Sequence, residues 1–271
     1  MLAWVDGRPA QVLPLVDRGL AYGDGLFETI AVRNARPRLL ERHLARLDEG
    51  CRRLRLPLDL TAFEAELMAF SAALGNGVAK LIVTRGDGLR GYAPPVEAEV
   101  RRVLLGSSWP TYPATNSEDG VLLFPCATRL AEQPVLAGLK HLNRLEQVLA
   151  RAEWSDARFA EGLMCDTSGR VIEGVFSNLF LVRDGQLLTA ELSRCGVAGV
   201  MRAEILGRAH ALGIPFSIRD LVLDELSAAD EVFLCNSLYG IWPVRGYQQH
   251  SWPLGPITRK LLAHFRPLLE A

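Results

Sequence analysis

The feature that most constrains the fold is a single stretch rich in proline, threonine and serine. It reads "WPTYPATNSEDG" and covers residues 109–120 of a chain of 271. This composition terminates helices and strands and is typical of a linker between domains. On both sides of it, runs with helical periodicity alternate with strand-like runs. We therefore expect an α+β fold with a small N-terminal domain over 1–106, a linker over 107–116 and a larger C-terminal domain over 117–271.

The N-terminal part contains hairpin and helix signals. Two hairpins are predicted over "MLAWVDGRPA" and "GLFETIAVRNARPRLL", the second turning at "NARP". Leucine and cysteine recur at three- and four-residue steps in "LLERHLARLDEGCRRLRL", which indicates an amphipathic helix. We expect a second helix over "LTAFEAELMAFSAALG", with Thr61 as its N-cap and Gly75 as its end.

The C-terminal part continues the same alternation. Strands are predicted at "GVLLFPCAT", "EGLMCDTSGRVIEG", "VFSNLFLVRDGQLLTA" and "DEVFLCNS". Helices are predicted at "GVMRAEILGRAHALG" and "ITRKLLAHFRPLL", and a further helix is expected to open at Lys140.

Composition excludes several classes of function. The net charge of -1 does not favour nucleic acid or an anionic membrane surface. No apolar run is long enough to span a bilayer, and "MLAWVDGRPAQ" lacks the regions of a signal peptide, so we expect a cytoplasmic protein. The five cysteines have no CxxC spacing and are expected to be reduced, buried thiols. The five histidines are scattered, so no metal site is expected.

Three separate features match the needs of one cofactor. Lys140 stands in "AGLKHLNRLEQVLAR", Glu173 lies in the otherwise apolar "RVIEGVFSNLFLV", and glycines precede a helix in "GVAGVMRAEIL". Taken alone, Lys140 could be a surface lysine. Glu173 lies either on a solvated strand face or in a buried pair with a cationic nitrogen, since an unpaired buried charge costs too much. Pyridoxal phosphate needs a lysine for its aldehyde, a carboxylate for its ring nitrogen and a helix end for its phosphate.

Two further motifs have competing interpretations. "GDGLRG", residues 86–91, matches a dinucleotide-binding fingerprint, but the prolines of the following "YAPP" exclude the helix that such a site needs. We expect instead a loop that presents Arg85, Arg90 and Tyr92 to a carboxylate. The strand in "EVFLCNSLYG" ends at Asn236 and Ser237. A turn is the favoured interpretation there, and donation to a phosphate is the alternative.

Several motifs resemble the fold-type IV pyridoxal phosphate enzymes, in the order in which that family carries them. They are "DRGLAYGDGLFET", "RHLARL", "KHLNRLEQ", "EGVFSNLFLV", "GVAGVMR" and "ADEVFLCNS". Within the family, "KHLNRLEQVLAR", "RGDGLRGY" and "CNSLYGIWPV" are more similar to aminodeoxychorismate lyases than to aminotransferases. The resemblance implies a two-domain fold like that of D-amino acid aminotransferase, a cofactor between the domains, and a homodimer.

The resemblance also implies a role for each matching residue. Lys140 would hold pyridoxal 5'-phosphate as a Schiff base, and Glu173 would bind the pyridine nitrogen beside Ser177 and Asn178. The phosphate would be bound by Arg46, by the Val200 and Met201 amides, and by Asn236 and Ser237. Where branched-chain aminotransferases carry Thr-Gly-Thr, this chain has Cys-Asn-Ser at 235–237, so a hydroxyl is retained at the third position. The resemblance assigns substrate contacts, less specifically, to Arg90, Tyr92 and Thr29.

The implied reaction converts 4-amino-4-deoxychorismate to 4-aminobenzoate and pyruvate in folate biosynthesis. Lys140, once displaced by the substrate amine, would remove the proton from the amine-bearing carbon. Loss of the enolpyruvyl group then leaves an aromatic ring. One alternative is a type IV aminotransferase for branched-chain or D-amino acids. Another is a cofactor-free binding protein on the same scaffold, which the joint presence of Lys140, Glu173 and Arg46 disfavours.

Overall fold

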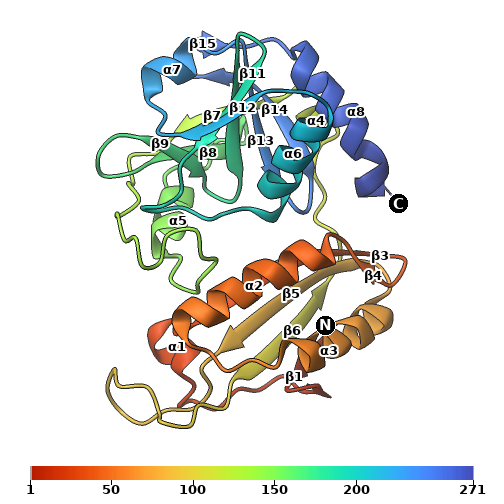
Figure 1. Cartoon of the computed structure of the whole chain (residues 1–271), viewed down its shortest axis with the longest axis vertical. Coiled ribbons are helices and arrows are strands. Elements are labelled where there is room, and N and C mark those ends of the chain that lie inside the picture. Colours follow the sequence, from red (N-terminus) through yellow and green to blue (C-terminus); the bar gives the residue numbers. More distant parts are fainter. Residues whose placement is uncertain (1, 271) are drawn as a thin grey trace. The chain divides into compact units, whose positions relative to one another are not determined.

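The computed structural model describes residues 2–270, which divide into two compact units (Figure 1). Unit 1 runs to Pro110 and also includes Leu139–Asn143, and unit 2 comprises Thr111–Gly138 and the chain from Arg144 onward. The first division, after Pro110, falls inside the segment 107–116 expected as a linker. The assignment of Leu139–Asn143 differs from the expected domain limits, because this segment hydrogen-bonds to a strand of unit 1.

Unit 1 is built on an antiparallel sheet in the order β2-β1-β6-β5-β3-β4 (Figure 1). Its strands are β1 (Leu2–Val5), β2 (Arg8–Pro9), β3 (Gly25–Arg33), β4 (Arg36–Pro37), β5 (Gly77–Thr84) and β6 (Arg101–Ser107). The predicted turn between β3 and β4 is present. Asn34 and Ala35 both have positive φ, 49° and 61°, which suits the right-handed twist of a two-residue hairpin.

The helices of unit 1 follow in chain order, and the second and third pack on one face of the sheet. They are α1 (Arg18–Tyr22), α2 (Leu40–Leu54) and α3 (Leu60–Leu74). Apolar side chains of α2, α3, β3, β5 and β6 form one buried cluster. The prediction that Thr61 caps α3 is wrong: the N-cap is Asp59, whose carboxylate accepts a hydrogen bond from Ala62 N at 3.0 Å. Gly75 ends the helix as predicted, with a φ of 70°.

Unit 2 contains a sheet in the order β12-β11-β10-β13-β14-β7-β8-β9, with β15 paired to β14. Its strands are β7 (Val121–Pro125), β8 (Phe159–Cys165), β9 (Val171–Gly174), β10 (Asn178–Arg183), β11 (Gln186–Ala190), β12 (Phe216–Arg219), β13 (Glu231–Asn236), β14 (Gly240–Tyr247) and β15 (His250–Ser251). Because β9 also pairs with β10, the strands from β10 round to β9 close into a barrel.

The helices of unit 2 are α4 (Thr115–Glu118), α5 (Leu145–Arg151), α6 (Val200–Ala211), α7 (Leu223–Ser227) and α8 (Pro256–Glu270). The prediction that a helix opens at Lys140 is wrong, since α5 begins at Leu145. Backbone hydrogen bonds of 140–142 to β3 hold that segment extended, so a helix cannot include it.

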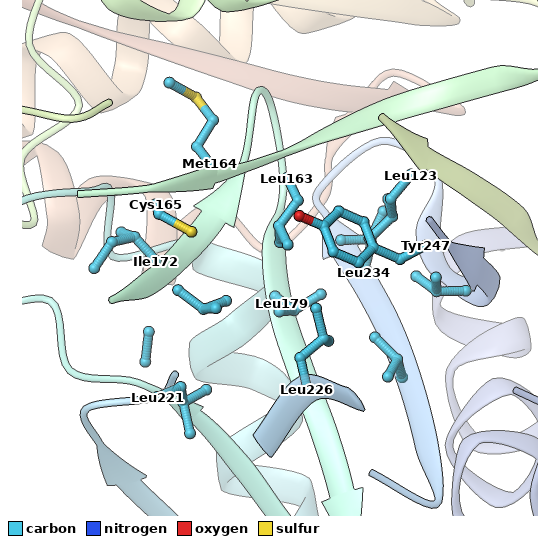
Figure 2. Close-up of a cluster of buried hydrophobic side chains, with 14 of the residues drawn as sticks. Leu123, Leu163, Met164, Cys165, Ile172, Leu179, Leu221, Leu226, Leu234 and Tyr247 are labelled. Carbon is cyan, nitrogen blue, oxygen red and sulfur yellow. The ribbon is translucent and has the colours of Figure 1, made fainter. Parts of the chain in front are cut away.

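The core of unit 2 fills the barrel interior with aliphatic side chains. Figure 2 shows leucines from β7, β8, β10 and β13, including Leu123, Leu163, Leu179 and Leu234, directed toward one another. All five cysteines are buried free thiols, as predicted. No helix within residues 2–270 has both the length and the apolar character needed to cross a membrane.

Candidate active site

Lys140 belongs to unit 1, where its segment lies antiparallel to the start of β3. Phe27 N donates to Lys140 O at 2.9 Å, and Leu142 N donates to Gly25 O at 3.0 Å. The neighbouring Leu139 is 2% exposed within the unit 1 core. Alternation along the segment therefore buries Leu139 and leaves Lys140 on the opposite face, beside Phe27.

The side chain of Lys140 lies over an aromatic ring that it shares with a second lysine. Lys140 Nζ is 4.3 Å from the centroid of the Phe27 ring, and Lys80 Nζ is 5.6 Å from the same centroid. Thr29 and Lys80 are register partners across β3 and β5, so their side chains project from the same face. Phe27, Thr29, Lys80 and Lys140 thus form one group, of which sequence analysis singled out only Thr29 and Lys140.

Arg46 is oriented by a buried carboxylate on the other face of β3. Glu28 is 1% exposed, and its two oxygens accept from Arg46 Nε at 2.7 Å and from Arg46 Nη2 at 2.5 Å. His43 Nδ1 lies 2.6 Å from Glu28 Oε2. Burial raises the pKa of Glu28, but the Arg46 and His43 contacts outweigh it and bring that pKa to about 2. Burial lowers the pKa of His43, which favours the neutral imidazole as a hydrogen-bond donor.

Sequence analysis missed Glu28 and His43, although a signal for them exists. Glu28 follows Leu26 and precedes Ile30 at two-residue spacing in "GLFETIAV", so strand alternation places it on the buried face. A carboxylate in that position needs a cation. His43 and Arg46 are three residues apart on α2 and so lie on one helix face.

Glu173 is buried in unit 2, so the default interpretation of a solvated strand face is wrong. Glu173 is 4% exposed, and its Oε2 accepts from Val197 N at 2.8 Å. Asn178, its register partner on β10, lies with Nδ2 3.5 Å from the same oxygen and donates to Val197 O at 2.9 Å. The carboxylate also interacts with Arg144. Burial lowers the pKa of Arg144, and the charge of Glu173 opposes this shift only in part.

Helix α6 begins close to Asn178. Its N-cap, Gly199, supplies no side-chain cap, so the first-turn amides of Val200 and Met201 have no side-chain acceptor there. A Cβ built on Gly199 would lie 1.9 Å from Asn178 Oδ1, so only glycine fits at this helix start. Within unit 2, Asn178 and its register partner Glu173 therefore lie beside the N-terminus of α6, which is the predicted anion-binding helix.

Arg202, in the first turn of α6, was not singled out by sequence analysis. It is 9% exposed and donates to two neutral oxygens, Thr189 Oγ1 at 3.2 Å and Ala190 O at 2.9 Å. Within residues 2–270 no carboxylate forms an ion pair with it. Burial lowers its pKa, but an arginine stays protonated at neutral pH. A buried cation without a direct ion pair therefore adds to the positive end of the α6 dipole, although Glu191 and Glu173 interact with it at longer range.

The remaining predicted residues of unit 2 have identifiable local roles. Ser177 Oγ donates to Glu161 Oε2 at 2.7 Å, which leaves its oxygen as an acceptor. Asn236 Oδ1 accepts from Leu238 N at 2.9 Å and Tyr239 N at 3.0 Å, so Asn236 forms the predicted turn after β13. Ser237 lies within that turn.

The glycine-rich loop of unit 1 has the predicted irregular form. Tyr92 is 86% exposed and Arg90 is also exposed. The buried Arg18 of α1 holds the loop by donating to Gly91 O at 3.1 Å and Tyr92 O at 3.0 Å. Arg85 is not displayed as expected. Its guanidinium lies 2.8 Å from Asp24 and is 11% exposed.

Comparisons with known proteins agree with this arrangement. The model of the amino-transferase class IV family matches residues 25–247. An aminodeoxychorismate lyase of Vibrio harveyi is 38% identical over 265 residues, which cover 95% of this chain and 97% of that protein. The crystal structure of 4-amino-4-deoxychorismate lyase from Pseudomonas aeruginosa is 68% identical, covers 100% of both chains and has a TM-score of 0.98. A branched-chain amino acid aminotransferase of Escherichia coli is 25% identical over 99% of this chain and 94% of that one, with a TM-score of 0.85. The fold and these full-length similarities show that the chain belongs to the class IV aminotransferase family.

Proposed function

We propose that this protein is a pyridoxal phosphate-dependent lyase that converts 4-amino-4-deoxychorismate to 4-aminobenzoate and pyruvate, a step of folate biosynthesis. The observation that carries the proposal is the full-length similarity to two aminodeoxychorismate lyases, at 68% and 38% identity. The residues implied by the resemblance are compatible with it. Their roles are proposed from the local geometry within each unit.

The donor sets of both units fit pyridoxal phosphate. Glu173 is a buried carboxylate that would pair with a protonated ring nitrogen. The Val200 and Met201 amides, supported by the Arg202 charge, would bind phosphate oxygens, and Ser237 would add a hydroxyl. Arg46 would contribute a guanidinium held in place by Glu28. Lys140 would hold the aldehyde covalently.

The proposed chemistry assigns the proton transfer to Lys140. When bound, pyridoxal phosphate supplies a sink for the electron pair that remains after a C–H bond breaks. Lys140, as a neutral amine, takes the proton from the amine-bearing carbon of the substrate. The bond between the ring and the enolpyruvyl oxygen then breaks, and the released enol takes up a proton to become pyruvate. Because the ring becomes aromatic, the protein mainly has to orient the reacting groups.

Cationic side chains of unit 1 would bind the two substrate carboxylates. Lys80 is exposed and shares the Phe27 ring with Lys140, so it presents a charge close to the reacting amine. Thr29, opposite Lys80, offers a hydroxyl on the same face. Arg90 and Tyr92 lie in an exposed loop that Arg18 anchors, and we retain them as candidates for the more distant carboxylate.

A direct assay distinguishes this proposal from aminotransferase activity. Purified protein with pyridoxal phosphate and aminodeoxychorismate should release 4-aminobenzoate, followed by fluorescence, and an equal amount of pyruvate, followed with lactate dehydrogenase. The same preparation should transfer amino groups from leucine or D-alanine to 2-oxoglutarate far more slowly. Efficient transamination without pyruvate release would favour the aminotransferase alternative, which the 25% identity to the E. coli enzyme keeps as second candidate.

We further propose a homodimer in which α5 contributes to the contact between subunits. Leu145, Val148 and Leu149 are 69%, 61% and 53% exposed and lie at helical spacing on one face of α5. Three exposed aliphatic side chains on one short helix are typical of an interaction surface. Val148→Glu should shift the mass measured by light scattering from dimer to monomer, whereas a dimer that persists would exclude this face.

The cytoplasm is the proposed compartment. All five cysteines are free thiols, as is usual for cytosolic proteins. Fractionation of cells expressing the tagged chain would test this, and recovery in the secreted fraction would refute it.

A further inference from the structure

Glu161 is a fully buried carboxylate for which the proposed reaction gives no role. It lies in β8 and is 0% exposed. Its Oε1 accepts from Gly162 N at 2.9 Å and from Val175 N at 3.0 Å, and its Oε2 accepts from Phe176 N at 3.3 Å and Ser177 Oγ at 2.7 Å. Within residues 2–270, the Glu161 carboxyl group therefore has four hydrogen-bond donors, three of them backbone amides, and no cationic partner.

Three of those four donors belong to the short loop between β9 and β10. This loop, residues 175–177, connects the strand that carries Glu173 to the strand that begins at Asn178. Glu173 and Asn178 are register partners, and both bind the backbone of Val197. The loop that Glu161 holds therefore sets the spacing between the two residues proposed to contact the cofactor ring.

The loop backbone packs closely against Glu161. Gly174 N donates to Ser177 O at 2.7 Å, which closes the loop. A Cβ on Gly174 would lie 3.0 Å from Glu161 Cδ and 2.3 Å from Ser177 Oγ. The glycine at 174 thus allows the carboxylate to approach the loop backbone.

We infer that Glu161 is a positioning residue, which fixes the 175–177 loop and thereby aligns Glu173 and Asn178 with the ring end of the cofactor. The inference rests on the proposed function, because it takes Glu173 as the partner of the ring nitrogen. The hydrogen bonds of Glu161 go to the loop donors and to Gly162 N, so its geometric effect passes through the loop.

Glu161→Gln is the test substitution, because the amide keeps the volume but replaces one acceptor oxygen with a donor. An NH2 group at the Oε2 position cannot accept from Phe176 N and can only donate to Ser177 Oγ, so one of the two contacts of Oε2 is lost and the other is reversed. Glu231→Gln is the matched control. Glu231 is a carboxylate of β13 that is 3% exposed. It accepts from Ile257 N at 3.0 Å and from Thr258 N at 2.7 Å, so its hydrogen bonds cap the start of α8 and do not involve the β9–β10 loop.

Two measurements, one on the cofactor-loaded proteins and one on the apoproteins, separate positioning from general stability. The first is the pH midpoint of the visible absorbance change of bound pyridoxal phosphate, which reports protonation of the Schiff-base nitrogen and shifts with the charge on the ring nitrogen. We expect Glu161→Gln to move this midpoint in the same direction as Glu173→Gln, but less. The second is the dissociation constant for pyridoxal phosphate with the apoprotein, which should rise about ten-fold, as for the loss of one hydrogen bond. Glu231→Gln should change neither, although both variants lower the urea midpoint.

A double variant decides whether the effect passes through Glu173. In a Glu173→Gln background, Glu161→Gln should cause no further change in the absorbance midpoint, because the group it aligns is absent. Additive shifts, or a Glu161→Gln protein with the wild-type midpoint and affinity, would overturn the inference while leaving the proposed function intact. A wild-type protein that binds no pyridoxal phosphate would instead refute the proposed function itself.

A second variant covers the case in which Glu161→Gln does not fold. Ser177→Ala removes the contact of Oγ with Glu161 Oε2, together with the contact of the same side chain with Tyr239. It should shift the absorbance midpoint in the same direction by a smaller amount, and again not in the Glu173→Gln background. An unchanged midpoint in this variant would count against the inference.

Discussion

Removing the Glu28 carboxylate should destabilise unit 1 and loosen Arg46 together. The pKa of Glu28 is about 2 in the folded protein against an ordinary value of 4.5, so the ionised form is favoured by folding. At about 1.4 kcal/mol per pKa unit, this difference corresponds to about 3 kcal/mol at neutral pH. Glu28→Gln also leaves the Arg46 guanidinium, 13% exposed, without its carboxylate. We expect a loss of about 3 kcal/mol in the free energy of unfolding.

The sign of the pH dependence follows from the depressed pKa. The Glu28 contribution is fully present above pH 4.5 and is lost as the pH falls toward 2. Urea unfolding of wild type and Glu28→Gln should therefore differ by about 3 kcal/mol at pH 7 and converge progressively in acid. Glu49→Gln is the control, because Glu49 pairs with Arg52 on the exposed side of the same helix and should be silent.

Cofactor binding provides an independent measure on the same variant. If Glu28 orients Arg46 for the phosphate, Glu28→Gln should weaken binding of pyridoxal phosphate by roughly ten-fold or more and leave binding of pyridoxal unchanged. A variant as stable as wild type at pH 7, with unchanged phosphate affinity, would refute the reasoning from this buried pair.

Four further predictions concern the other charged groups. Glu173→Gln should remain saturable with pyridoxal phosphate but lose roughly ten- to hundred-fold in kcat, since an amide cannot keep the ring nitrogen protonated; near-normal turnover would make Glu173 a structural residue. Arg90→Lys should raise the KM for aminodeoxychorismate without altering cofactor absorbance, because lysine lacks the guanidinium fork; unchanged kinetics would remove Arg90 from the site. Arg202→Met should weaken binding of pyridoxal phosphate more than of pyridoxal in equilibrium titrations, and equal effects would argue against a phosphate role. Burial raises the pKa of Glu161 to about 7 from 4.5, so its contribution to stability is present below pH 4.5 and is lost as the pH rises through 7. The free energy of unfolding of Glu161→Gln, measured in urea, should lack this decline with pH. The same pH dependence in the variant and the wild type would disprove the prediction.

Elements whose signals are local could be predicted from the sequence. The apolar spacing along α2 and the asparagine-containing turn after β3 depend on neighbours within one helical turn or one hairpin. The same holds for Gly75 at the end of α3 and for the Asn236 turn. Two local details were wrong. Asp59 caps α3 in place of Thr61, and α5 starts at Leu145 because strand-like hydrogen bonds from β3 hold 140–142 extended.

The candidate site was only partly accessible from the sequence. The residue types at Lys140, Glu173 and the glycines before α6 indicated a pyridoxal phosphate site, and the resemblance assigned them roles that stay predictions. The supporting charges were missed. Glu28 meets Arg46 across 18 positions of the chain, and Glu161 meets Ser177 across 16. Arg202 reaches Thr189 over 13 positions.

By itself, the sequence determined the class of the fold, the order of its elements and the chemical types available to a site, because these depend on periodicity and on residue identity. Only the tertiary structure decided which charged side chains are buried and what neutralises them. A buried carboxylate either destabilises or stabilises the fold, depending on the hydrogen-bond donors that distant strands and helices place around it. Glu28, with its guanidinium, and Glu161, with its backbone amides, have the same side chain. Their pKa values lie on opposite sides of 4.5 because their partners differ.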